Sequence, residues 1–278
     1  KLERLNALNT GIENDTNSQD VLIPAFRAAY TRQNARDAKL SSFLDVPIPN
    51  WRVTYSGLSK IPALKEIFRS VSITHGYNST YAVGSYASSL FYSDRPELLG
   101  LGVNADEIRA DAANEEGVAQ PVLIVNQLTL SEQFSPLIGV NLRTRGDVTV
   151  KVDYKKRRDL ALNLTNAEVT ELKSNDVTLD LGMTKAGMKV PFRIRGAYKT
   201  LENDVTMRMA FTIRDTKTIQ RKIDDAPTVT QGNINIQFRP TVSYQLNKQA
   251  NLQFYFERSI NEPRVSNSFR RTTTSFGI

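Results

Sequence analysis

Polar and apolar residues alternate over unusually long runs, and this alternation limits the possible folds more than any other feature of the chain. The longest run extends from Val148 to Leu164, and shorter runs recur at 177–183, 205–213, 234–246 and 252–256. Successive side chains of a strand point to opposite faces of a sheet, so a period of two residues predicts strands with one apolar and one polar face.

Short turn candidates separate these runs. Sequential strands joined by tight turns form an antiparallel meander, so we predict an all-β, antiparallel fold with roughly ten strands between Trp51 and Ile278. The candidate turns are Gly146-Asp147, Asn175-Asp176, Lys185-Ala186-Gly187, Asn203-Asp204 and Asn247-Lys248-Gln249.

The chain before Pro47 has a different character. A capped, apolar-spaced segment predicts a helix at Asp20–Arg32, and Pro62 in a first turn predicts a second, short helix at Ile61–Phe68. We therefore divide the chain into a helical and loop segment, 1–46, and a strand region, 47–278, with an acidic loop at about 93–120. The chain starts without Met and stops inside an expected strand, so we expect it to be a fragment of a longer protein.

The length of the runs bears on what the apolar face meets. Ordinary strands have about five or six residues, whereas a tilted crossing of a bilayer takes about 9–11, which several runs supply. Lys156 and Arg158 fall on the apolar face, where each would cost about 2–4 kcal/mol at the centre of a bilayer. They must lie at or beyond a membrane interface, and 17 residues of strand reach about 56 Å. A transmembrane β-barrel segment with strands projecting from the membrane is the favoured interpretation, and a soluble β-sandwich is the alternative.

The alternation assigns candidate side chains to each face of such a wall. The candidates for a water-filled lumen are Thr149, Lys151, Asp153, Lys155, Arg157, Asp159, Arg208, Thr212 and Arg214. The candidates for lipid contact are Val148, Val150, Val152, Leu160, Leu162, Leu164, Met207, Met209 and Phe211. We expect the lumen-facing residues to form a hydrated wall to which passing molecules adhere weakly.

Signals of chemistry are few. The chain has no cysteine and one histidine, His75, which lies in an expected strand and is interpreted as an interfacial or packed residue. We therefore predict no enzymatic activity, no metal site and no cofactor. The net charge of +7 is spread along the chain without a nucleic-acid-binding motif, so we expect no nucleic-acid partner.

Several segments resemble one family in its own order. They are the segment from Pro47 through Trp51 to Pro62, the strand Val71–Tyr86 with its His-Gly-Tyr-x-Ser-Thr-Tyr core, Ser131–Gly139, Tyr154–Asn166 and Arg270–Ile278. Together they resemble the C-terminal barrel region of the SprA/Sov family, the outer-membrane translocon of the type 9 secretion system. The match covers most of residues 47–278 and is weaker in the first 46 residues and the acidic loop.

The resemblance implies a part of a giant single-chain barrel in the outer membrane of Bacteroidota, with a wide pore that exports folded cargo carrying C-terminal sorting domains. It implies a PorV-like barrel at a lateral opening, a periplasmic Plug protein and lipid or lipopolysaccharide as partners. The alternation by itself would equally allow an ordinary outer-membrane porin or transporter. A soluble β-sandwich binding or adhesin module is the alternative outside membranes.

Overall fold

The computed structural model describes residues 17–31, 49–90, 121, 123–194, 196–222, 225–247, 249–265 and 268–278. Within this part of the chain, nine strands form one antiparallel sheet in the order β1-β2-β3-β4-β5-β8-β9-β10-β11. The strands are β1 (Trp51–Tyr55), β2 (Phe68–Ser88), β3 (Leu123–Thr144), β4 (Val148–Asn163), β5 (Glu168–Lys185), β8 (Val205–Lys222), β9 (Thr228–Gln245), β10 (Asn251–Pro263) and β11 (Arg271–Gly277). The predicted all-β, antiparallel fold is confirmed.

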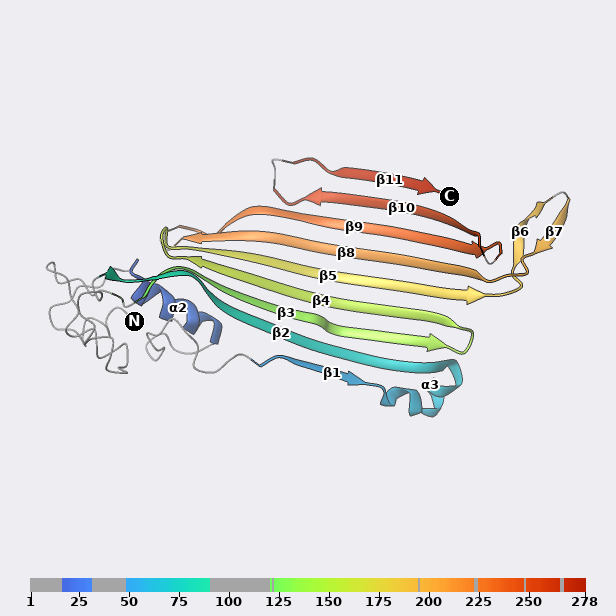
Figure 1. Ribbon diagram of the computed structural model, residues 1–278, viewed down its shortest axis with the longest axis horizontal. Coiled ribbons are helices and arrows are strands. Elements are labelled where there is room, and N and C mark those ends of the chain that lie inside the picture. The colour runs from blue at the N-terminus through green and yellow to red at the C-terminus, as the bar shows by residue number, and fades with distance from the viewer. Residues whose placement is uncertain are drawn as a thin grey trace.

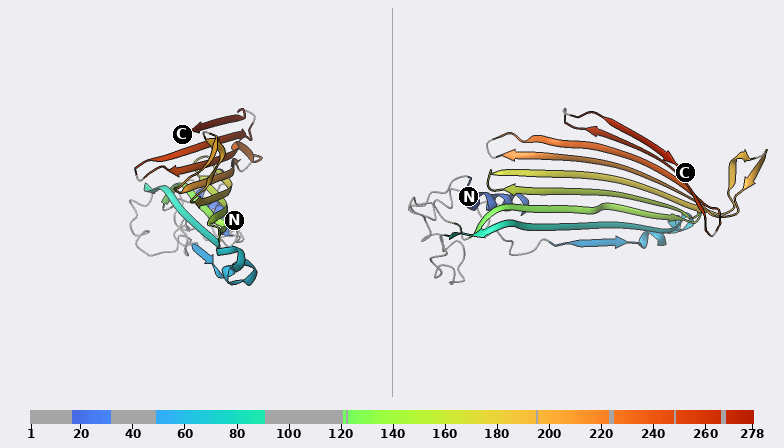
Figure 2. Two further views of the ribbon diagram at one scale, coloured as in Figure 1. Left: turned by 90° about the vertical axis from the view of Figure 1, so that its right-hand side faces the viewer. Right: turned by 45° about the horizontal axis from the view of Figure 1, so that its top comes forward.

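The strands lie side by side as a single elongated layer (Figure 1). Every neighbour in the sheet is also the next long strand along the chain, as the short turns predicted. A separate hairpin, β6 (Lys189–Ile194) with β7 (Ala197–Thr200), connects β5 to β8 and projects from one end of the layer. The strand directions rotate across the layer in the end-on view of Figure 2, as the twist of β-sheets requires.

The helices are short and lie at opposite ends of the strands (Figure 1). The first, α2 (Gln19–Thr31), and the second, α3 (Pro62–Ile67), agree with the two predicted helices, and Pro62 occupies the first turn of α3. A 3-10 turn, η1 (Gly57–Lys60), precedes α3. None of the described helices is long and apolar enough to cross a membrane.

The helix α2 packs on the far end of the sheet and creates the main apolar core of the described residues. Leu22, Ile23 and Phe26 of α2 meet Val125, Leu128, Leu130, Leu160 and Leu162 of β3 and β4. The Gln19 side chain fixes the helix to β3, since its Nε2 donates to the Leu123 carbonyl (2.7 Å) and its Oε1 accepts from the Val125 amide (3.0 Å). This pair of bonds copies the donor and acceptor pattern of a neighbouring strand.

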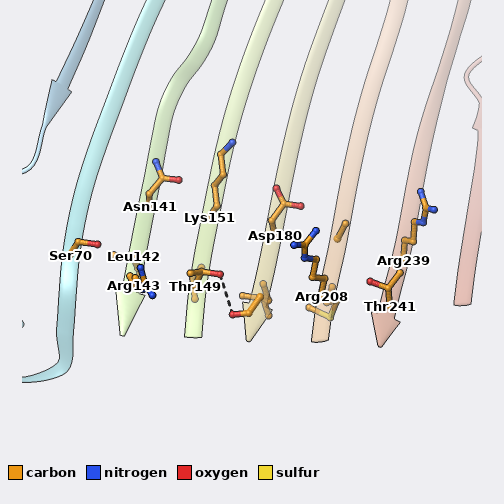
Figure 3. A pocket seen from close by; sticks show the side chains of 15 residues that line it. Ser70, Asn141, Leu142, Arg143, Thr149, Lys151, Asp180, Arg208, Arg239 and Thr241 are labelled. Atoms are coloured by element: carbon orange, nitrogen blue, oxygen red, sulfur yellow. Dashed lines mark hydrogen bonds between the residues drawn. The ribbon is translucent and has the colours of Figure 1, made fainter. Parts of the chain in front are cut away.

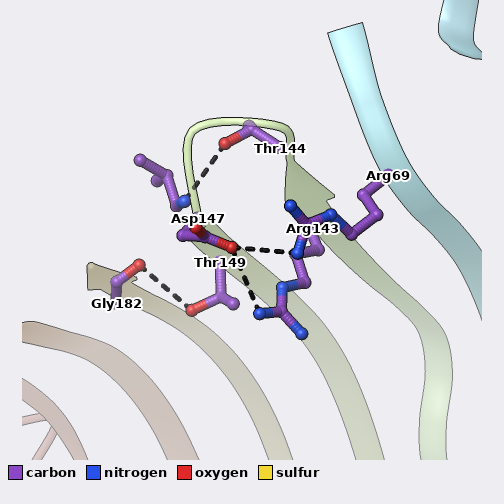
Figure 4. A network of polar contacts seen from close by, with 7 residues as sticks. Arg69, Arg143, Thr144, Asp147, Thr149 and Gly182 are labelled. Atoms are coloured by element: carbon purple, nitrogen blue, oxygen red, sulfur yellow. Dashed lines mark hydrogen bonds and ion pairs between the residues drawn. The ribbon is translucent and has the colours of Figure 1, made fainter. Parts of the chain in front are cut away.

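The turn between β3 and β4 is held by one carboxylate (Figure 4). Asp147 adopts a left-handed conformation (φ 58°), which aspartate tolerates better than most residues. Its Oδ1 accepts hydrogen bonds from Arg69 of β2 (3.1 Å) and Arg143 of β3 (3.2 Å), and the Val148 amide donates to Thr144 Oγ1 (3.1 Å). The predicted Gly146-Asp147 turn is confirmed, and it also ties β2 to the turn.

One predicted turn is wrong. Asn175 and Asp176 lie inside β5, where they pair with Lys156 and Lys155 on one side. The Asp176 carboxylate is satisfied across the sheet by Arg214 (Nε to Oδ2, 2.9 Å), so neighbouring strands outweigh the local turn preference of Asn-Asp. The acidic loop expected at 93–120 and most of segment 1–46 lie outside the described residues.

Candidate functional site

The register of the strands separates the side chains into two chemically different faces. Residues directly opposite each other on paired strands share a face. One row joins Arg143, Thr149, Gly182, Arg208 and Thr241. The adjacent row joins Leu142, Val150, Leu181, Met209 and Pro240 on the other side of the sheet. We call these sides the polar face and the apolar face.

The structure brings all nine lumen candidates together on the polar face, although they come from two strands separated by β5. Basic side chains on this face pair with carboxylates along their own strand. Lys151 Nζ lies 3.1 Å from Asp153 Oδ2, and Arg157 Nε lies 2.7 Å from Asp159 Oδ2. Asp153 is buried, because it lies over Gly139 beside Pro136.

Hydrogen bonds between side chains also cross the polar face. Ser131 of β3 donates to Asp159 (2.6 Å), and Arg214 of β8 binds Asp176 of β5. A second chain of bonds runs through Thr216, Asn233 and Asn261 of β8, β9 and β10, with O···O and N···O distances of 2.5 Å. Gln237 donates to Glu257 in the same region (2.7 Å). Side-chain hydrogen bonds therefore link neighbouring strands at several places on the polar face.

An open hollow of about 730 Å³ lies on the polar face near the β3–β4 turn (Figure 3). Basic side chains from four strands surround it, namely Arg143, Lys151, Arg208 and Arg239, and Asp180 lies among them. Thr149 Oγ1 donates to the Gly182 carbonyl beside it (3.1 Å), where the missing side chain of Gly182 makes room. The hollow is open and carries five charged side chains beside apolar ones such as Leu181 and Ala210.

The apolar face carries an exposed apolar band. Ile138, Val177 and Val242 remain 56%, 39% and 36% exposed, although each lies inside a long strand. On β9 the apolar positions run from Ile234 to Tyr244. Ten residue steps span about 33 Å, and a strand tilt of about 40° reduces this height to about 25 Å, the height of the lipid-facing band of outer-membrane barrels.

The nine lipid candidates fall into two different environments. Val148, Val150 and Val152 of β4 and Met207, Met209 and Phe211 of β8 belong to the apolar band. The assignment is wrong for Leu160 and Leu162, each only 2% exposed, because α2 covers them. Leu164 packs against the same core. Alternation alone does not distinguish a face covered by a helix from one left open.

A group of aromatic rings marks one border of the apolar band. Trp51 of β1 stacks on Tyr77 of β2 with a centroid distance of 4.5 Å, and Tyr77 contacts Phe134 of β3 at 4.9 Å. His75 lies against Phe134, and its Nδ1 is 2.6 Å from the Leu137 carbonyl. His75 is therefore packed among aromatic rings at the border, in agreement with its interpretation from the sequence as an interfacial or packed residue.

A charged row follows immediately beyond the band on the same face, and we call it the charged belt. It contains Glu132, Lys156, Arg158, Glu171, Lys173, Asp215, Lys217, Arg221 and Arg264. The border lies at a different height on different strands. On β3 the last apolar residue, Phe134, pairs with Lys156 of β4. On β10 the first charged residue, Arg258, pairs with Phe238 of β9. A level border on tilted strands would produce such a difference.

Glu171 organises the centre of the belt. Its side chain is fully buried, and its carboxylate accepts from Arg158 Nε (2.5 Å) and Arg221 Nη2 (2.9 Å) and contacts Lys173 Nζ (3.0 Å). Burial alone would raise the pKa of Glu171, but the bonds from Lys173, Arg221 and Arg158 outweigh burial and lower the pKa to about 2. Glu171 is not among the residues predicted from the sequence, although a glutamate in the apolar phase of β5 is a signal that the sequence does carry.

Within the described residues, no group of three or more His, Cys, Asp or Glu side chains could hold a metal ion. No protein-family model and no curated protein matches the chain. The candidate site that the register defines is the pair of faces, one polar and one apolar.

Proposed function

We propose that this chain forms part of the wall of an outer-membrane translocon of the type 9 secretion kind, which exports folded cargo with C-terminal sorting domains. The observation that carries the proposal is the contrast between the two faces of one sheet. One face is polar on every long strand, and the other exposes an apolar band of about the height of a lipid bilayer core.

The length of the strands supports a tall wall over an ordinary porin. β3 has 22 residues and β2 has 21, about twice the number needed for a tilted crossing. The charged belt and the region under α2 account for the remainder, since both lie beyond the apolar band. The wall of a wide pore for folded proteins would extend beyond the membrane in this way.

The polar face suits passage without adhesion. Four of its carboxylates, those of Asp153, Asp159, Asp176 and Glu257, are bound by neighbouring cations or amides. Its apolar side chains are few, so it offers a passing protein little surface for stable docking. Among the described strands, β1 and β11 are the edges of the sheet and each pairs on one side only, so closure of a barrel requires strands beyond those nine. A PorV-like barrel, a Plug protein and sorting-domain cargo remain the proposed partners.

Photo-crosslinking during export tests the proposal. A photoreactive amino acid replaces Lys155 on the polar face of the full-length protein, and a matched variant carries it at Leu179 on the apolar face. We expect the Lys155 variant to form adducts with secreted protein and the Leu179 variant to form adducts with lipid. Lipid adducts at Leu179 without protein adducts at Lys155 would favour a porin for small solutes. Absence of both would contradict a membrane wall.

A further inference from the structure

The charged belt contains more cations than its carboxylates neutralise. Arg158, Lys173 and Lys217 lie directly opposite one another on β4, β5 and β8. Lys156 lies two residues from Arg158 on the same face and is exposed. Like charges directly opposite each other on a sheet are destabilising, so this row requires negative charge close by.

The carboxylates of the belt are already engaged. Glu171 is shared by Arg158, Lys173 and Arg221, and Asp215 accepts two bonds from Arg264 (2.6 and 2.7 Å). Glu132, which faces Arg158 from β3, accepts from the Tyr77 hydroxyl (2.9 Å).

Two lysines are left with unused charge. Among the ion pairs of the described residues, none engages Lys156 or Lys217. Their ammonium groups are therefore available to an added anion.

Apolar side chains adjoin these cations on the side toward the membrane. Tyr154, Val177 and Ile213 form the apolar row nearest to the belt on β4, β5 and β8. This row lies two residues, or about 7 Å, from Lys156 along β4. It lies four residues, or about 13 Å, from Lys173 along β5 and from Lys217 along β8, with Asn175 and Asp215 in the row between. A ligand with an anionic head and apolar chains would meet cations and the apolar band at the same time. A free anion would use only the first of these surfaces.

We propose that Lys156, Arg158, Lys173 and Lys217 bind the phosphate groups of an anionic lipid whose acyl chains lie on the apolar band. Phosphate oxygens accept charge-assisted hydrogen bonds from several donors at once, which a row of three opposed cations supplies. The inference rests on the proposed function, because it requires the apolar face to meet lipid.

The test measures lipid retained by the full-length protein in neutral detergent. The probes are bis-phosphorylated lipid A, the same lipid without phosphates, and inorganic phosphate as a competitor. The variant Lys156→Gln/Lys217→Gln removes the two lysines and leaves the Glu171 cluster intact. The control Lys155→Gln/Arg208→Gln removes equal charge from the polar face of the same two strands.

We expect phosphorylated lipid to be retained over its dephosphorylated form, and the lysine variant to bind it about five- to tenfold more weakly than wild type and control. Equal retention of the two lipids, or equal loss in both variants, would overturn the inference. Full displacement by inorganic phosphate would assign the site to a soluble anion and overturn the lipid assignment. Lipid-phase labelling of a cysteine at Leu179 separates the two failures, because its absence overturns the proposed function itself.

Discussion

A single charge placed in the middle of the apolar band tests the position of the membrane. Leu179 of β5 lies between Val152 of β4 and Phe211 of β8, near the centre of the band. Arginine at the midplane of an outer-membrane barrel costs about 2–4 kcal/mol, so Leu179→Arg should lower the free energy of unfolding by about 3 kcal/mol. That loss is about a 150-fold change in the ratio of folded to unfolded protein.

The matched control is the next residue. Thr178 lies on the polar face, so Thr178→Arg should change stability by less than about 0.5 kcal/mol. The assay is denaturant titration of the full-length protein in lipid vesicles, with the folded fraction scored by protease resistance. A Leu179→Arg variant as stable as wild type, beside a strongly destabilised Thr178→Arg variant, would refute the assignment of the faces.

Three further predictions concern packing and pH. Glu171→Gln leaves three cations around a neutral amide and should cost about 3 kcal/mol in the same titration. Because folding lowers the pKa of Glu171 from 4.5 to about 2, the ionised carboxylate stabilises the folded protein fully above about pH 4.5, and this contribution is lost as the pH falls toward 2. Identical dependence of stability on acid pH in wild type and Glu171→Gln would contradict this. Gly139→Ala brings a Cβ within 2.6 Å of Pro136 and should cost about 1–3 kcal/mol, whereas Gly146→Ala, with 3.9 Å of space, should not. Ile23→Ala should cost about 2–5 kcal/mol and increase proteolysis near α2; unchanged proteolysis would show that the helix is not docked.

The strands and faces could be predicted because alternation is a local property that survives in the folded sheet. The even positions of β4 and the odd positions of β8 share one face, since the register pairs them through β5 without a shift. The helices α2 and α3 were predictable for the same reason, because capping and the placement of Pro62 are local signals.

What could not be predicted depends on contacts between distant segments. Leu160 and Leu162 have the same alternation as Val150 and Val152, and only the docking of α2, more than a hundred residues earlier, distinguishes them. Asn175 has a local preference for a turn that pairing with β4 and β8 overrides. Lys156 and Arg158 conflict with the apolar phase of β4, and that conflict did point to a border. The charged belt around Glu171 could not be predicted, because two of the cations that bind Glu171 come from the neighbouring strands β4 and β8.

Cysteine labelling in native membranes distinguishes a lipid-facing wall from a protein core. This chain contributes no native cysteine to the background, and any cysteine elsewhere in the full-length protein is first replaced. Single cysteines at Thr149, Val150, Lys151, Val152 and Leu160 of the full-length protein are probed with an impermeant, water-soluble maleimide and with a lipid-phase reagent. We expect aqueous labelling at Thr149 and Lys151, lipid labelling at Val150 and Val152, and neither at Leu160, which α2 covers. If Val150 and Val152 resist both reagents, the apolar face is a protein core and the membrane wall is contradicted.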